Sequence, residues 1–75
     1  MYKVQPKCSK WVYSRIFDKS KQDYVVAQFE TIEQARELLN KERVADIKRS
    51  KDGIAPLYRI VKVNGRKVEE IEVVK

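Results

Sequence analysis

The chain has 75 residues, of which 43% are hydrophobic and 37% are charged, and its 17 basic and 11 acidic side chains give a formal net charge of +6. This length and composition predict one globular domain, near the lower size at which a hydrophobic core is stable without disulfides or metal ions. The sequence contains no apolar run long enough to span a membrane and no signal peptide, so we expect a cytoplasmic protein without a membrane partner.

The chain begins with an alternating pattern, in which Tyr2, Val4, Pro6 and Cys8 are separated by polar residues. A repeat of two residues is typical of a β-strand, and proline is tolerated in a strand at the edge of a sheet. We therefore expect residues 1–9 to form either an edge strand or an extended arm.

Two runs rich in β-branched and aromatic residues come next, residues 11–17 (WVYSRIF) and residues 24–29 (YVVAQF). The segment between them, residues 18–23, is polar throughout and suits a turn. Two strands joined by a short polar loop are most simply an antiparallel hairpin.

A helix start follows the second run without a linker. Thr31 can act as the N-cap, and Gln34 stands at the position that completes a capping box. The apolar residues that follow lie on one stripe of a helix, Ile32, Ala35, Leu38 and Leu39. A short helix with one apolar stripe is not stable alone, so we expect it to pack on the sheet.

The predicted end of the helix lies between Asn40 and Arg43. Val44 and Ile47 would fall well off the apolar stripe if the helix continued, and Asn40 can adopt a left-handed terminating conformation. We expect the charged residues 41–52 to contain a short strand at residues 44–48 or to form an ordered loop.

The last part of the chain carries the clearest hairpin pattern. Asn64 and Gly65 separate two β-rich runs, residues 57–63 and 66–74. Both central residues of a type I′ turn need positive φ, which asparagine and glycine tolerate. The predicted order is strand, strand, helix, strand, strand. The expected fold is therefore a single α+β domain over residues 1–75, with an antiparallel sheet of about four strands and one helix packed on one face.

A single helix covers only one face of such a sheet, so the other face needs a different cover. Alternation along the strands separates the bulky rings from the smaller apolar residues, and we assign the smaller residues to the helix. The opposite face then carries the candidate binding residues Trp11, Tyr13, Arg15, Phe17, Tyr24 and Tyr58. That face would be covered by residues 1–9 and 41–56, by a second copy in a homodimer, or by a different molecule.

Enzymatic chemistry has little support in the sequence. There is no histidine, Cys8 is the single cysteine, and the two glycines are isolated. These residues provide no metal cluster, no phosphate-binding glycine loop and no base to activate a thiol. We predict a protein that is not an enzyme and has no cofactor.

Two binding functions remain. The first is binding to a larger protein of unknown identity through the aromatic face or an edge strand. The alternative is nucleic-acid binding, in which rings stack on bases and basic residues contact phosphates. The basic candidates are Arg15, Lys48, Arg49, Lys51, Arg66 and Lys67. Residues 23–40 are acidic overall and weaken the positive field, so we favour the protein partner.

The runs at residues 11–17, 29–39 and 58–63 resemble small accessory proteins common in bacteriophage and prophage genomes. Such proteins have a hairpin, a helix begun by Thr or Ser, and a returning strand similar to the Tyr-Arg-Ile-Val of this chain. The resemblance implies a modulator or inhibitor of a host or phage machine that acts by binding. The first half also resembles the arm-site DNA-binding domains of phage-type integrases, which usually place a third strand before the helix; here only residues 2–8 can supply one.

Overall fold

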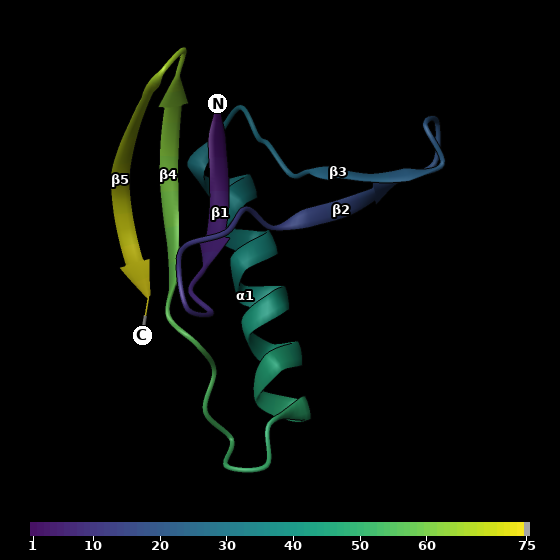
Figure 1. The fold of residues 1–75 in the computed structure, drawn as a ribbon, viewed down its shortest axis with the longest axis vertical. Helices are drawn as coiled ribbons and strands as arrows, with labels where there is room; N and C mark the ends of the chain where they lie inside the picture. The colour runs from purple at the N-terminus through teal and green to yellow at the C-terminus, as the bar shows by residue number, and fades with distance from the viewer. Residues whose placement is uncertain (75) are drawn as a thin grey trace.

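The computed structural model describes residues 1–74, which form five strands and one helix. The elements in chain order are β1 (Tyr2–Pro6), β2 (Arg15–Asp18), β3 (Asp23–Val26), α1 (Ile32–Arg49), β4 (Tyr58–Asn64) and β5 (Lys67–Val74). The strands form two antiparallel sheets, and α1 packs on the larger one (Figure 1). The predicted α+β class and the order strand, strand, helix, strand, strand are confirmed, with β1 added at the start.

The larger sheet has the strand order β1-β4-β5. Among the five strands β1 pairs with β4 and with no other, so residues 1–9 adopt the edge-strand alternative, and Pro6 is the last residue of β1. The predicted hairpin of β4 and β5 is present, but its turn lies one residue later than predicted. Asn64 pairs with Lys67 and has no positive φ, so the two residues of the turn are Gly65, with a φ of 58°, and Arg66, and the predicted type I′ turn with Asn64 and Gly65 at its centre is wrong. The pairing of β4 with β5 shifts register between Ile60 and Val61, which marks a bulge.

Two separate segments close the outer edge of β1. The backbone hydrogen bonds there are Val12 N to Pro6 O (3.1 Å), Ser14 N to Val4 O (2.9 Å), Tyr2 N to Phe29 O (2.7 Å) and Phe29 N to Tyr2 O (2.8 Å). Residues 12–14 and Phe29 thus extend the sheet beyond β1. The chain leaves this edge after Ser14 and returns to it before Phe29.

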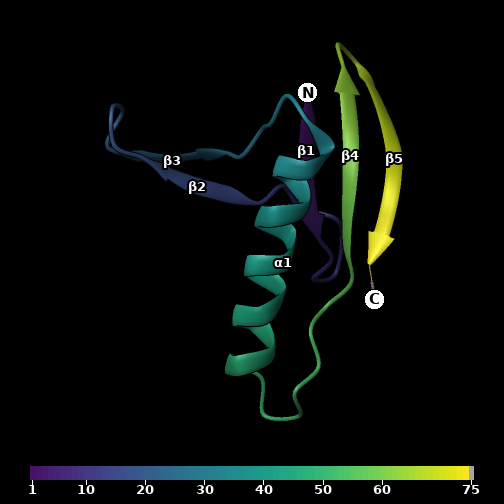
Figure 2. The same ribbon diagram turned by 180° about the vertical axis from the view of Figure 1, so that it is seen from behind.

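The residues between these two segments form the second sheet, in which β2 pairs with β3. We call residues 15–26 the hairpin arm. The arm projects sideways from the sheet and helix in Figure 1 and in the opposite view of Figure 2. The predicted hairpin is therefore present, but its strands are shorter than the predicted runs and lie outside the main sheet. The outer parts of those runs, at Val12, Ser14 and Phe29, form backbone hydrogen bonds with β1.

The helix begins where the sequence indicates, with the Thr31 and Gln34 capping box formed. Its predicted end is wrong, because α1 continues to Arg49 and residues 44–48 are helical. The second half carries little apolar surface and is attached by polar side chains, which a hydrophobic stripe does not reveal. Lys48 and Arg49 in the last turn complement the negative end of the helix dipole.

The core lies between α1 and one face of β1 and β4. It consists of the buried residues Val4, Ala35, Leu39, Tyr58 and Ile60, with Tyr2, Phe29, Ile32, Leu38 and Val74 packed around them. The predicted helix stripe is confirmed by these contacts. The predicted face of β4 is wrong: α1 covers the face with Tyr58 and Ile60. The small Ala35 side chain allows a close approach to the sheet, and the longer helix reaches the Tyr58 hydroxyl.

Candidate interaction surfaces

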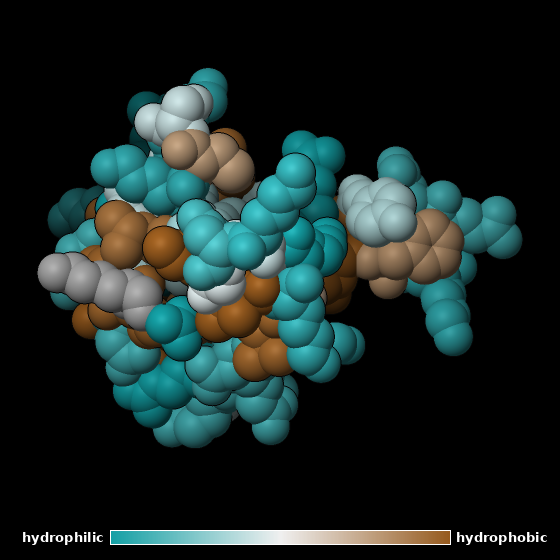
Figure 3. All heavy atoms as spheres, turned by 90° about the horizontal axis from the view of Figure 1, so that it is seen from below, coloured by the Kyte–Doolittle hydropathy of each residue, from teal (hydrophilic) through white to brown (hydrophobic). Residues whose placement is uncertain are grey.

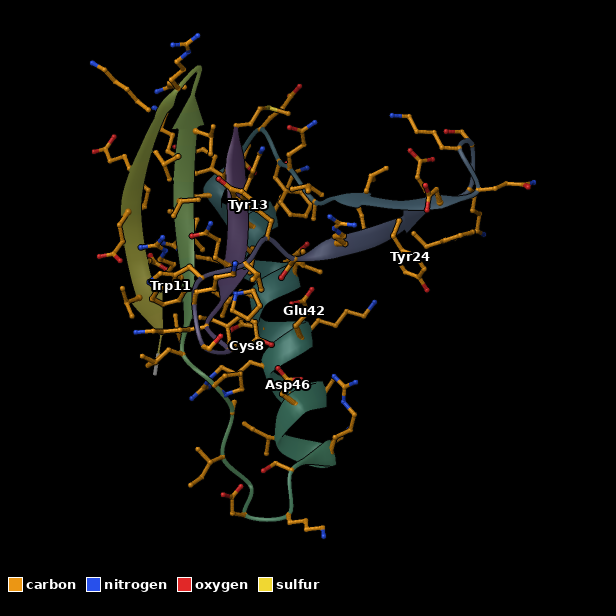
Figure 4. The ribbon with its side chains drawn as sticks, viewed as in Figure 1. Cys8, Trp11, Tyr13, Tyr24, Glu42 and Asp46 are labelled. Atoms are coloured by element: carbon orange, nitrogen blue, oxygen red, sulfur yellow. The ribbon has the colours of Figure 1, made fainter. Side chains whose placement is uncertain are left out.

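The residues predicted to share one docking face lie in three places. Tyr58 is buried under α1 and is 2% exposed, so its assignment to a binding surface is wrong. Trp11 and Tyr13 lie over the face of the larger sheet opposite α1, whereas Tyr24 lies far out on the hairpin arm (Figure 4). Arg15 and Phe17 also belong to the arm. The structure therefore divides the predicted site into a sheet face and an arm.

Polar contacts fix the second half of α1 to the sheet. The Tyr58 hydroxyl donates a hydrogen bond to the Asp46 carboxylate, and burial together with this carboxylate raises the pKa of Tyr58 well above its usual range. The Ser14 hydroxyl donates to Glu42 Oε2 at 2.8 Å. Burial raises the pKa of Glu42, and the nearby Asp46 adds to this effect although the bond from Ser14 opposes it.

On the sheet face opposite α1, cations surround the two half-buried rings. The Arg59 guanidinium carbon lies 4.3 Å from the centroid of the Trp11 ring, and Lys7 Nζ lies 5.6 Å from it. Lys3 Nζ lies 4.9 Å from the centroid of the Tyr13 ring. These distances are typical of cation–π contacts, which attract the positive charge to the negative face of the ring.

Arg59 is held in place from several sides. Its Nε donates to Gln5 Oε1 at 2.7 Å, and its Nη1 lies 3.2 Å from Glu70 Oε1. Gln5 is buried, as is the neighbouring Val61. The Trp11 ring therefore lies on the Arg59 guanidinium, which Gln5 and Glu70 hold in place, and the sheet below is filled by buried side chains.

The hairpin arm carries an exposed aromatic pair. Phe17 and Tyr24 face each other across β2 and β3, with ring centroids 5.4 Å apart and an interplanar angle of 65°. Phe17 is 52% exposed and Tyr24 is 62% exposed. Edge-to-face contact stabilises the pair, but more than half of each side chain still faces water.

The arm has almost no other support. Among the elements that the structure describes, β2 and β3 pack closely with each other, whereas α1 packs against β1 and β4. In the space-filling view of Figure 3 the arm stands clear of the body, with apolar atoms among hydrophilic ones. Ala27 N donates to Ser14 O at 3.0 Å, so the two ends of the arm meet at one backbone hydrogen bond.

The basic residues of the nucleic-acid alternative do not form one patch. Lys48, Arg49 and Lys51 lie at the end of α1, Arg66 and Lys67 lie at the β4–β5 turn, and Arg15 lies on the arm. Figure 1 shows the end of α1 and the β4–β5 turn at opposite ends of the molecule. Arg49 also pairs with Asp46 on its own helix, at 2.8 Å.

The outer strand of the larger sheet, β5, presents a further apolar surface. Val68, Ile71 and Val73 are exposed on it. Two of its acids are paired, Glu72 with Arg36 on α1 and Glu70 with Arg59. The hydrogen bonds from Arg36 lower the pKa of Glu72. A bulge and acidic side chains are devices that hinder pairing of an edge strand with another chain.

Residues 1–74 form no pocket and contain no group of three or more side chains suited to hold a metal ion. Cys8 is an exposed free thiol. Within the same residues no helix has the length and apolar character needed to cross a membrane.

Several residues at these surfaces have no signal in the sequence. Gln5 and Arg59 meet across the pairing of β1 with β4, and Ser14 and Glu42 meet between the sheet edge and α1. The spacing of Glu42 and Asp46, four residues apart, was the available sign that the helix has a second, acidic stripe.

No family model, curated protein or solved structure matches this chain.

Proposed function

We propose that this chain is a small non-enzymatic binding protein that attaches to a larger protein through its hairpin arm. The observation that supports the proposal is the exposed Phe17–Tyr24 pair on a hairpin that projects from the body. Large apolar side chains gathered on a projecting element are a common feature of protein interfaces.

The energetics favour an interface on the arm. A two-stranded hairpin alone is marginally stable in water, so burying the exposed rings against a partner would also stabilise the arm. Each aromatic side chain buries about 150–250 Å², and roughly half of that area is still exposed on Phe17 and Tyr24. At about 25 cal/mol per Å², transfer of each ring to a partner contributes about 2–3 kcal/mol. This magnitude is that of an interface hot spot.

The edge of β5 is a less suitable surface for a protein partner than the hairpin arm. The edge of β5 carries acidic residues and a bulge, both of which oppose strand addition. The resemblance to small bacteriophage accessory proteins adds the expectation that the partner is a component of a host or phage machine whose activity the bound chain alters.

The proposal is tested by replacing both rings, in the variant F17A/Y24A. Wild type and variant are immobilised at equal density, exposed to lysate of the source cells, and the retained proteins are compared by mass spectrometry. We expect a protein retained by wild type to be lost from the variant. Its affinity, measured afterwards with purified partner, should fall at least about 30-fold, because a hot-spot residue contributes about 2 kcal/mol or more.

The matched control is V44A/I54A, which removes two exposed apolar side chains, 50% and 69% exposed, outside the arm. This control should retain the partner. Equal retention by F17A/Y24A would contradict the proposal. Sedimentation of the purified proteins reports whether the partner is a second copy: wild type would then self-associate, and F17A/Y24A would be monomeric.

A further inference from the structure

The face of the larger sheet opposite α1, called here the basic face, has features that the protein-binding arm does not use. Lys3 and Lys7 lie near the rings of Tyr13 and Trp11, and Arg59 supports the indole from the sheet. In Figure 4 the two labelled rings lie on the sheet side of the molecule, away from Tyr24. Rings and cations therefore alternate on one surface.

Charge is distributed unevenly around this face. Residues 1–17 contain the basic side chains Lys3, Lys7, Lys10 and Arg15 and no acidic side chain. The acidic side chains of residues 30–37 belong to the start of α1 and the residues just before it, on the opposite side of the sheet. Glu70 reaches the basic face from β5, but its carboxylate is paired with Arg59. The field over the rings is therefore positive.

The basic face lies over a well-packed part of the sheet. The sheet beneath it is closed by the buried side chains of Gln5 and Val61. Lys7 follows Lys3 by four steps of extended chain, a span of about 13 Å, which is long enough to follow an extended polymer. The indole of Trp11 is positioned by Arg59, so its orientation does not have to be ordered when a ligand binds.

We infer that the basic face binds single-stranded nucleic acid. Bases stack on Trp11 and Tyr13, and Lys3 and Lys7 contact the phosphates. Each lysine now lies over a ring; on binding, a base takes its place there and the ammonium moves to a phosphate. Stacking on an aromatic side chain contributes about 1–3 kcal/mol per base and tolerates any base, so we expect weak sequence preference.

This inference is independent of the proposed function. The arm projects from a different part of the molecule, and the rings of Phe17 and Tyr24 are not part of the basic face. F17A/Y24A is therefore expected to bind nucleic acid as wild type does.

Trp11 is the single tryptophan of the chain, so its fluorescence reports directly on the basic face. The experiment titrates the full chain with oligothymidylate and with oligouridylate of about 12 nucleotides, within the site sizes of single-strand binding folds. We expect quenching of the indole on saturation by either strand. With about two phosphate contacts the slope of log Kobs against log salt should be about −1.4, a roughly sevenfold loss between 50 and 200 mM salt.

Two charge-reversal variants separate the basic face from net charge. K3E/K7E and K48E/K51E change the charge of the chain equally, but the second pair lies at the end of α1 and in the loop after it. K3E/K7E should remove the salt dependence and weaken binding at least tenfold, whereas K48E/K51E should keep most of the wild-type affinity and the same slope. The single variants K7E and K51E, both at exposed positions, give the same comparison if K3E/K7E does not fold.

The inference is overturned by any of the following results: no binding at 50 mM salt, binding detected by anisotropy without a change in Trp11 fluorescence, or equal weakening by the two double variants. Duplex DNA or poly-glutamate serves as the competitor. Competition by either one as strong as that by the single strand would show attraction by charge without base stacking, and would also overturn it.

Discussion

Replacing Tyr58 by phenylalanine removes the hydroxyl that joins β4 to the second half of α1 and leaves the buried ring in place. A hydrogen bond to a charged acceptor contributes about 1.5–3 kcal/mol. Asp46 is 25% exposed and keeps its contact with Arg49, so the lower end applies, about 1.5 kcal/mol. For a domain of this size the melting temperature should fall by about 6–12 °C.

The assay is urea unfolding of wild type, Y58F, D46A and the double variant at pH 7. The coupling energy from this cycle should be about 1 kcal/mol or more, because the two groups meet in one hydrogen bond.

The pKa of Tyr58 is raised above the ordinary 10.0, so the stability contributed by the Tyr58 hydroxyl is full below about pH 10 and is lost at higher pH. A Y58F variant as stable as wild type, or a coupling energy of zero, would refute the contact.

Three further outcomes follow from the fold. Burial raises the pKa of Glu42 above 4.5, so wild type loses stability as the pH rises from 4.5 through the raised pKa of this carboxyl. In urea unfolding, E42Q should therefore be more stable than wild type at neutral pH and equally stable under acidic conditions. Leu39 is 1% exposed, so L39A should lose about 2–5 kcal/mol in the same assay, whereas V44A should stay within about 0.5 kcal/mol. N40A should raise the melting temperature, because Asn40 is an interior helix residue and alanine is the better helix former; a lower value would indicate a helix end there.

The features that the sequence predicts correctly depend on neighbours along the chain. The Thr31 capping box, the apolar stripe through Leu39 and the presence of a hairpin turn at Gly65 are each defined within a few residues. Local backbone preferences and helix or strand periodicity are sufficient to identify such features. The class and order of the elements follow from them.

The features that the sequence does not predict depend on distant partners. The second half of α1 is fixed by Ser14 and Tyr58, which come from other parts of the chain. The runs around β2 and β3 have the same alternation whether they pair with each other or with β1, so the separation of the hairpin arm from the main sheet is not visible in their pattern. For the same reason the alternation predicts that the rings share one face, whereas in the structure Trp11, Tyr58 and Phe17 lie in three different places.

If the hairpin arm is a separate binding element, as we propose, its excision removes binding and leaves the body folded. The Ala27 N to Ser14 O hydrogen bond allows residues 15–26 to be replaced by an Asn-Gly turn, because the same bond closes a two-residue hairpin loop. We expect the shortened chain to unfold cooperatively, within about 1 kcal/mol of wild type, and to bind no protein partner of the intact chain. Retained affinity for that partner, or loss of the folded body, would contradict the account.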